Sequence, residues 1–193
     1  MSGGVRAVVL DIGSVLEVVD DSVFPGPFQS RHGLDQDAVM TAADNLPGDA
    51  GLGELTEAEV RAHWQRELGL DEVAADELMR DFWTWYVGTL DQELFDNSGP
   101  GAREAEACWG FDAVTDDIVY SHEVGLRKPD PAIFALAAER LDVRPSEAVL
   151  LDDVEANVLG ARASGWQAVL HEETTASIAT IEALLSEASQ AAY

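Results

Sequence analysis

The sequence is poor in cysteine and has no long apolar segment. Cys108 is the only cysteine among 193 residues, which excludes an intrachain disulfide framework and suits a reducing compartment. No stretch approaches the roughly 20 consecutive apolar residues of a membrane span, so we expect no membrane partner. The first residues lead directly into a predicted strand, without the pattern of a signal sequence, and the expected location is therefore cytoplasmic.

Basic residues are also scarce. The chain has 11 Lys and Arg residues against 37 Asp and Glu residues, and its formal net charge is -26 at pH 7. Nucleic acids and anionic membranes would be repelled by this charge, and we predict that the protein binds neither. A small anionic substrate would have to be attracted by local cations and a metal ion.

Residues suited to catalysis occur in three short segments that lie far apart. VVLDIG contains Asp11 and Gly13, GLRKPDP contains Lys128, and AVLLDD ends in Asp152 and Asp153. The outer two segments are apolar runs that stop at a carboxylate, and ligands of open α/β sheets bind beyond the carboxyl ends of strands. We therefore expect these side chains at one crevice, with Lys128 on a loop. Three carboxylates and one ammonium suit a divalent metal and an anionic substrate.

Each of these segments also has a purely structural explanation. Strands that end in Asp are common, and a Lys before Pro is often a solvated loop cation. Asp153 would also serve as the cap of a helix that begins near Val154. The occurrence of all three segments in this order favours the functional interpretation.

The pattern along the chain predicts an α/β fold with a doubly wound parallel sheet. Strand and helix patterns alternate, which is the signature of such a sheet. The predicted strands are residues 5–10, 118–121, 148–151 and 167–170, and the predicted helices between and after them are residues 131–141, 154–163 and 175–189.

The segment from about residue 24 to residue 96 has a helical pattern instead. Thr56-Glu57-Ala58-Glu59 is a capping box, which predicts a helix over residues 56–68 that ends at Gly69. A second, amphipathic helix is expected from Asp71 through Trp85. The aromatic residues of this segment are assigned to its own core, except Trp83, which we expect to face outward. His32 and His63 are predicted to be surface residues.

The three segments, in this order, resemble motifs of the haloacid dehalogenase superfamily, whose members are mostly magnesium-dependent phosphatases. Asp11-Ile12-Gly13-Ser14-Val15 is similar to the first motif, GLRKPDP to the third, and LLDDVEAN, which ends at Asn157, to the fourth. The resemblance covers residues 5–20 and about 97–171. It implies a Rossmann-like core formed by residues 1–20 and 97–193, and a small helical cap formed by residues 21–96.

The resemblance also implies roles for individual residues. Asp11 would be the nucleophile that forms an aspartyl-phosphate, and Mg²⁺ would be held by Asp11, Asp153 and the carbonyl of Gly13. Lys128 would neutralise the phosphoryl oxygens and keep the nucleophile ionised.

Four more residues receive supporting roles from the same resemblance. Asp152 and Asn157 would orient the metal shell, and Asn97 and Ser98 would bind the substrate. Together these assignments predict a magnesium-dependent phosphatase that acts on a small phosphorylated metabolite.

Two features depart from the family pattern. Gly13 replaces the Asp that acts as general acid and base in most family phosphatases, a contribution often worth about 10²–10⁴ in rate. The second motif is weak, because relatives carry additional residues, a strand among them, between Phe95 and Asn97. We expect residues 118–121 to pair with the first strand in place of the missing one. The alternatives are a substitute strand at residues 92–95 or pairing with a second chain in a homodimer.

Two other functions stay open. A 2-haloacid dehalogenase uses the same Asp to attack carbon without a metal, but its fourth motif lacks an Asp-Asp pair, so Asp152 and Asp153 favour a metal. A catalytically impaired member with a binding or assembly role would be consistent with the weak second motif.

Overall fold

The computed structural model describes residues 4–90 and 115–190, which belong to two compact units. The core unit consists of Met1–Val18, Leu90–Val119 and Leu126–Tyr193. The helical unit consists of Val19–Thr89 and Tyr120–Gly125. No helix in the described ranges is both long and apolar enough to cross a membrane.

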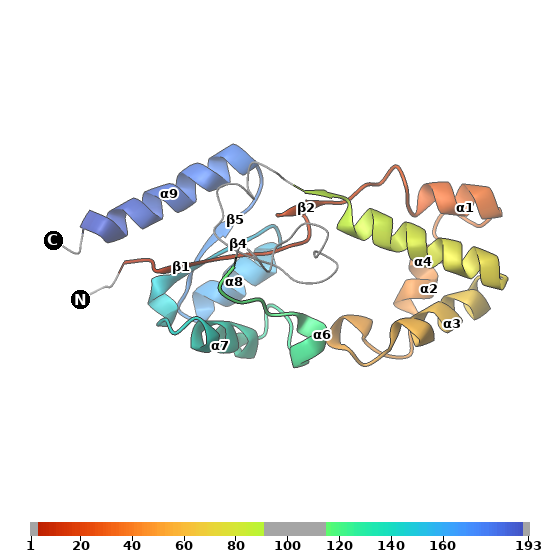
Figure 1. The fold of residues 1–193 in the computed structure, drawn as a ribbon, viewed down its shortest axis with the longest axis horizontal. Coiled ribbons are helices and arrows are strands. Elements are labelled where there is room, and N and C mark those ends of the chain that lie inside the picture. Colours follow the sequence, from red (N-terminus) through yellow and green to blue (C-terminus); the bar gives the residue numbers. More distant parts are fainter. Residues whose placement is uncertain (1–3, 91–114, 191–193) are drawn as a thin grey trace. The chain divides into compact units, whose positions relative to one another are not determined.

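The core unit is built on a three-stranded parallel sheet with the order β1-β4-β5 (Figure 1). Its strands are β1 (Ala7–Leu10), β4 (Ala148–Asp152) and β5 (Gln167–Leu170). All five residues of the central strand β4 are buried, as expected for an apolar run between two parallel neighbours. Because the strands are parallel, their carboxyl ends lie on one edge of the sheet. A separate sheet of two short strands pairs β2 (Glu17–Val18) with β3 (Thr89–Leu90).

Helices cover both faces of the parallel sheet, so the predicted doubly wound α/β fold is confirmed. These helices are α7 (Pro131–Arg140), α8 (Glu155–Ala163) and α9 (Thr174–Gln190). Leu150 packs in one cluster with Phe134 of α7 and Val158 of α8. The next residue along β4, Val149, packs instead with Ile181 of α9, because successive side chains of a strand point to opposite faces.

A buried charge precedes the central strand. Glu147, which ends the 3-10 helix η4 (Pro145–Glu147), is only 6% exposed. Its carboxylate accepts hydrogen bonds from the guanidinium of Arg144 at 2.7 Å and from the backbone N–H of Arg144 at 2.9 Å. These two bonds lower the pKa of Glu147 from 4.5 to about 2.

The predicted strand at residues 118–121 is wrong. Ser121 begins the short helix α6 (Ser121–Val124), and Ile118 lies in irregular chain. The carbonyl of Ile118 accepts a hydrogen bond from Nη1 of Arg140 at 3.1 Å, while its side chain packs with Leu16 and Leu151. The segment is apolar because its side chains are partly buried, not because it forms a strand. The side chain of Arg140 supplies the hydrogen-bond partner that a neighbouring strand would otherwise give the Ile118 carbonyl. Among the described residues no strand pairs with the outer edge of β1.

The helical unit contains four helices besides α6. These are α1 (Gly26–His32), α2 (Ala38–Asp44), α3 (Glu57–Glu67) and α4 (Glu72–Val87), with a 3-10 turn η1 (Ala50–Leu52). The capping box of α3 is confirmed, since the N–H of Thr56 donates to Glu59 at 2.8 Å and the N–H of Glu59 donates to Thr56 at 3.3 Å. The side chain of Asp71 caps α4 by accepting from the N–H of Ala74 at 2.9 Å.

Most aromatic residues of the helical unit form its core, as predicted. Trp64 is buried in one cluster with Phe24 and Phe28, and Phe82 and Trp85 pack against this cluster. Trp83 is 40% exposed, as expected, but the assignment of Tyr86 to the core is wrong, because Tyr86 is 45% exposed. The prediction that His63 lies on the surface is wrong, because His63 is 5% exposed. Its Nδ1 accepts a hydrogen bond from Arg66 at 2.9 Å, so its Nε2 donates to a backbone carbonyl at 2.9 Å.

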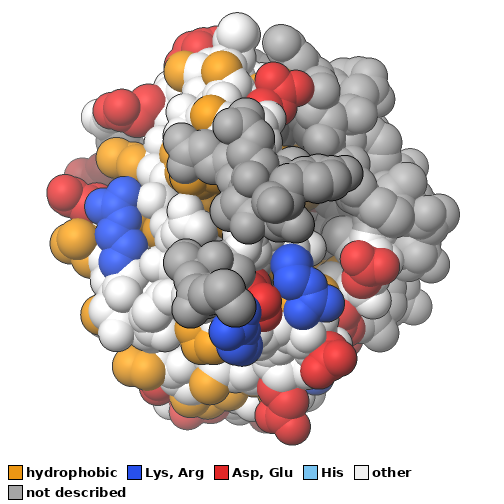
Figure 2. All heavy atoms as spheres, turned by 90° about the vertical axis from the view of Figure 1, so that its left-hand side faces the viewer, with side chains coloured by type: hydrophobic (Ala, Val, Ile, Leu, Met, Phe, Trp, Pro, Cys, Tyr) orange, Lys and Arg blue, Asp and Glu red, His pale blue; other side chains and the backbone are white. Residues whose placement is uncertain are grey.

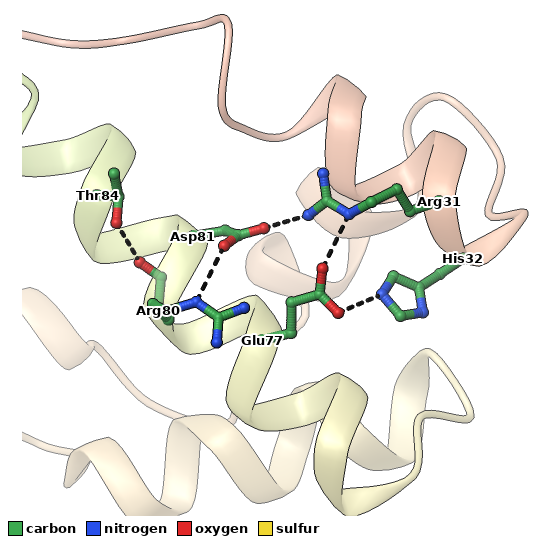
Figure 3. Close-up of polar contacts among 6 residues, drawn as sticks. All are labelled: Arg31, His32, Glu77, Arg80, Asp81 and Thr84. Atoms are coloured by element: carbon green, nitrogen blue, oxygen red, sulfur yellow. Dashed lines mark hydrogen bonds and ion pairs between the residues drawn. The ribbon is translucent and has the colours of Figure 1, made fainter.

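A network of charged side chains joins α1 to α4 (Figure 3). Arg31 donates to Glu77 at 2.8 Å and also to Asp81, and His32 lies 3.2 Å from the second oxygen of Glu77. Asp81 is paired with Arg80 as well, at 3.6 Å. Among the described residues visible in Figure 2, acidic, basic and hydrophobic side chains are interspersed.

Candidate active site

Carboxylates from two neighbouring strands meet at the carboxyl edge of the parallel sheet. Asp11 follows β1, and its backbone N–H donates to the carbonyl of Leu151 at 2.9 Å, which continues the pairing of β1 with β4. Asp152 is the last residue of β4, and Asp153 is the next residue. Ligand oxygens of Asp11, Asp152 and Asp153 all lie within 4.8 Å of one another. The sequence predicted this meeting, and the structure places the three residues accordingly.

Lys128 reaches this edge from the loop before α7. Its Nζ lies 2.7 Å from Oδ1 of Asp11 and also donates to Oδ2 of Asp152. The side chain of Lys128 is 21% exposed, so the ammonium is half-buried between the two carboxylates. Ion pairs of Lys128 thus join the second segment singled out in the sequence to the first, through Asp11, and to the third, through Asp152.

Asp152 is fully buried and holds the site together. Its Oδ1 accepts hydrogen bonds from the N–H of Val154 and from Nδ2 of Asn157, both at 2.9 Å, and its Oδ2 accepts from Lys128. The direct contact with Lys128 was not predicted from the sequence. Since both oxygens of Asp152 already accept from protein donors, Asp11 and Asp153 are the more accessible carboxylates of the cluster.

Burial and the ion pairs shift two pKa values. Burial raises the pKa of Asp11 above its ordinary value, the charge of Asp152 raises it further, and the ammonium of Lys128 only partly opposes both. Burial alone would lower the pKa of Lys128, but the attraction and hydrogen bonds of Asp11 and Asp152 outweigh it, so the pKa is raised. Lys128 therefore carries its charge at neutral pH.

Gly13 lies in the turn after β1. The bridge between Gly13 and Glu17 consists of hydrogen bonds from Ser14 N–H to Glu17 at 2.8 Å and from Glu17 N–H to Ile12 at 2.9 Å. These two bonds involve Ser14 and Ile12, the residues on either side of Gly13. The carbonyl of Gly13 takes part in neither bond. Asn97 and Ser98, the predicted substrate-binding residues, lie outside the described residues.

These groups fit a magnesium ion. Mg²⁺ prefers oxygen ligands and is usually held by one or two carboxylates together with water and substrate oxygens. Asp11 and Asp153 supply such carboxylates within one cluster. Gly13, whose carbonyl is the third predicted ligand, lies two residues after Asp11 in the turn. The donor set contains no sulfur and no imidazole among its described members, which suits a hard cation.

One residue near the site was missed in the sequence. Gly160 lies in α8, one turn after Asn157, and approaches the loop that carries Lys128. The signal available was a glycine inside a predicted helix, a position where glycine is costly unless packing requires it.

Comparison with known proteins found similarity over part of the chain. Residues 95–165, which include Lys128, Asp152 and Asp153, match the model of the haloacid dehalogenase-like hydrolases. Ribulose-1,5-bisphosphate 5-phosphatase of Halopiger xanaduensis is 42% identical over 72 residues, which are 37% of this chain and 30% of that protein. The chain thus spans less than a third of this curated relative.

Solved structures share the fold at low sequence identity. A HAD family enzyme of Bacteroides thetaiotaomicron in a magnesium complex has a TM-score of 0.69 and 17% identity, covering 88% of this chain and 94% of that one. A 2-haloacid dehalogenase of Pseudomonas syringae has a TM-score of 0.62 and 18% identity, covering 86% of each chain. Residues 95–165 are thus similar to the haloacid dehalogenase-like hydrolases, and the chain shares the fold of these solved structures.

Proposed function

We propose that the protein is a magnesium-dependent phosphatase that acts on a small phosphorylated metabolite through an aspartyl-phosphate. The observation that supports this most directly is the ammonium of Lys128, which lies 2.7 Å from Asp11 in the same cluster as Asp152 and Asp153. An ion pair at a carboxylate nucleophile is what a site for an anionic substrate requires, since it offsets the repulsion between the two anions.

In the proposed reaction Asp11 attacks phosphorus. The bond from a carboxylate oxygen of Asp11 to phosphorus forms while the bond from phosphorus to the leaving oxygen breaks. Water then attacks phosphorus in the aspartyl-phosphate, which releases inorganic phosphate and restores Asp11. The leaving oxygen takes its proton from water, because Gly13 offers no side-chain acid.

Lys128 and Asp152 prepare the site for both steps. The Lys128 ammonium, charged at neutral pH, binds the phosphoryl oxygens, and the buried carboxylate of Asp152 fixes its position. Asp11, Asp153 and the Gly13 carbonyl would hold Mg²⁺, which supplies positive charge to the nucleophile and the phosphoryl group. Asn157 acts through Asp152, to which its amide donates at 2.9 Å.

The remaining expectations belong to the same proposal. A cytoplasmic location, a small anionic substrate and a homodimer are proposed from the sequence. The division into a core of residues 1–20 and 97–193 and a cap of residues 21–96 is likewise a proposal, as are substrate contacts from Asn97 and Ser98.

The test is a panel assay with phosphate esters and 2-haloacids, each with and without Mg²⁺. We expect phosphate release that requires Mg²⁺ and is lost in Asp11→Asn, because an amide cannot act as the nucleophile. Asp116→Asn, an exposed Asp to Asn change in the core unit, should retain full activity. Halide release without Mg²⁺ would support a dehalogenase instead. Phosphatase activity in Asp11→Asn would exclude the aspartyl-phosphate route, and an inactive wild type would favour a binding role.

A further inference from the structure

Helix α8 contacts Asp152 and also the loop that carries Lys128, the ion-pair partner of Asp152. Asn157, in the first turn of α8, donates to Asp152 at 2.9 Å. Gly160, one turn later, lies against Pro129, the residue that follows Lys128. The spacing of three residues puts Asn157 and Gly160 on one face of the helix. A single rigid element thus contacts the carboxylate at one end of the pair and the loop at the other.

The contact at Gly160 leaves no room for a side chain. A Cβ atom at Gly160 would lie 2.7 Å from Cβ of Pro129, 2.9 Å from the carbonyl oxygen of Pro129 and 3.3 Å from a ring carbon of Phe134. Two of these atoms belong to a rigid proline, and one of the two is a backbone atom. A substitution therefore requires the loop or the helix to move.

The neighbours of Pro129 limit where that movement can go. Phe134 is 3% exposed and packs edge-on against Trp166, with the two ring centroids 5.8 Å apart. The ring of Phe134 therefore cannot move away to make room for a side chain at residue 160. Asp130 caps α7 by accepting from the N–H of Ala132 at 2.9 Å, and its own N–H donates to Arg127 at 3.0 Å. Displacement of Pro129 would thus be transmitted to the adjacent Lys128.

We propose that Gly160 is a positioning residue for Lys128. Its missing side chain lets the loop approach α8 closely enough for the ammonium to reach Asp11 and Asp152 together. This inference rests on the proposed function only in assigning the ammonium to phosphate binding. Gly160→Ala is then expected to move Lys128 away from the two carboxylates and to weaken anion binding.

Lys128 is the only lysine of the chain, which permits a direct test. Protein labelled with ¹⁵N-lysine gives one side-chain Nζ signal, and amine modification followed by mass spectrometry reports on Lys128 and the α-amino group alone. In Gly160→Ala we expect a shifted Nζ signal and faster modification of Lys128. The matched control is Gly26→Ala, also in a helix, where an added Cβ meets no described atom within 4 Å. Signals and rates equal to wild type in both variants would overturn the proposal.

Measurements of phosphate affinity show whether Gly160→Ala acts by displacing Lys128 or by destabilising the whole fold. With Mg²⁺ present, calorimetry should show inorganic phosphate binding about tenfold or more weakly to Gly160→Ala, since a displacement of about 1 Å at a site can cost about 100-fold. In a Lys128→Ala background the same change should have no further effect. Equal losses in both backgrounds would contradict the proposal, because the effect would then bypass Lys128.

Two outcomes keep this test independent of the proposed function. If the wild type binds no phosphate, the proposed function fails, and the Lys128 signal still decides the role of Gly160. If Gly160→Ala does not fold, Pro129→Gly removes the same contact from the loop side. That variant should also shift the Lys128 signal, and an unchanged signal there would overturn the proposal.

Discussion

Replacing Gly13 with Asp tests whether the turn after β1 lacks only a proton donor. A Cβ atom at Gly13 would meet no atom of the described chain within 4 Å. Gly13 is also absent from the residues with positive φ, so an ordinary side chain is compatible with its backbone. A carboxylic acid two residues after Asp11 would be available to protonate the leaving oxygen and then to deprotonate the attacking water.

The expected gain in phosphatase rate for Gly13→Asp follows from the energetic cost of releasing the leaving oxygen of the ester without a proton. General acid–base catalysis contributes about 10²–10⁴ in rate, which corresponds to about 3–5 kcal/mol of the barrier. We expect about 100-fold, at the low end, for alkyl phosphates, because the surroundings of the new carboxyl group are not adapted to it. Aryl phosphates should gain much less, since a phenolate leaves without a proton.

The assay compares kcat/KM for alkyl and aryl phosphates in wild type, Gly13→Asp and Gly13→Asn. The Asn variant matches Asp in shape and lacks the acidic proton. A gain of equal size in Gly13→Asn, or the same gain for both kinds of ester, would refute the argument. So would an unchanged rate in a folded Gly13→Asp protein with normal Mg²⁺ affinity.

Substitutions at Asp153 and Glu147 separate metal binding from fold stability. Mg²⁺ at about 100 times its Kd should stabilise the wild type by about 2.7 kcal/mol, and Asp153→Asn should abolish the corresponding rise in Tm, whereas Asp116→Asn should keep it. Unchanged Mg²⁺ affinity in Asp153→Asn would contradict its assignment as a ligand. Because the pKa of Glu147 falls from 4.5 to about 2 in the folded protein, its stabilising effect is complete above pH 4.5 and is lost as the pH falls towards 2. The Tm difference between wild type and Glu147→Gln should therefore shrink as the pH falls from 4.5 towards 2. A difference that does not depend on pH would refute this role of Glu147. Glu182→Gln, at an exposed position, is the control.

Local signals in the sequence were sufficient for most elements. The run AVLLD predicted β4 because a central parallel strand is apolar on both faces, and the capping box at Thr56 predicted the start of α3. The meeting of Asp11 with the Asp152–Asp153 pair followed from the parallel sheet alone.

Contacts that depend on tertiary packing could not be predicted in this way. Ile118 lies in an apolar segment that resembled a strand, but its carbonyl is bound by the side chain of Arg140. His63 is buried because two partners satisfy its ring nitrogens, and neither partner is identifiable from the helical pattern. The close approach of Gly160 to Pro129 likewise joins two segments whose distance no local rule determines.

The balance of charge connects the metal to substrate binding. Three carboxylates and one ammonium give the cluster a formal charge of minus two, and the whole chain carries a formal charge of -26. Two like charges 4 Å apart repel by about 4 kcal/mol at an effective dielectric constant of about 20, so a phosphate ester would be opposed at this site without a metal. Lys128 offsets only part of this repulsion, because Asp11 and Asp152 share its single positive charge. A divalent cation would bring the cluster to neutrality, and substrate affinity in the proposed reaction is therefore expected to depend on Mg²⁺ before any chemical step.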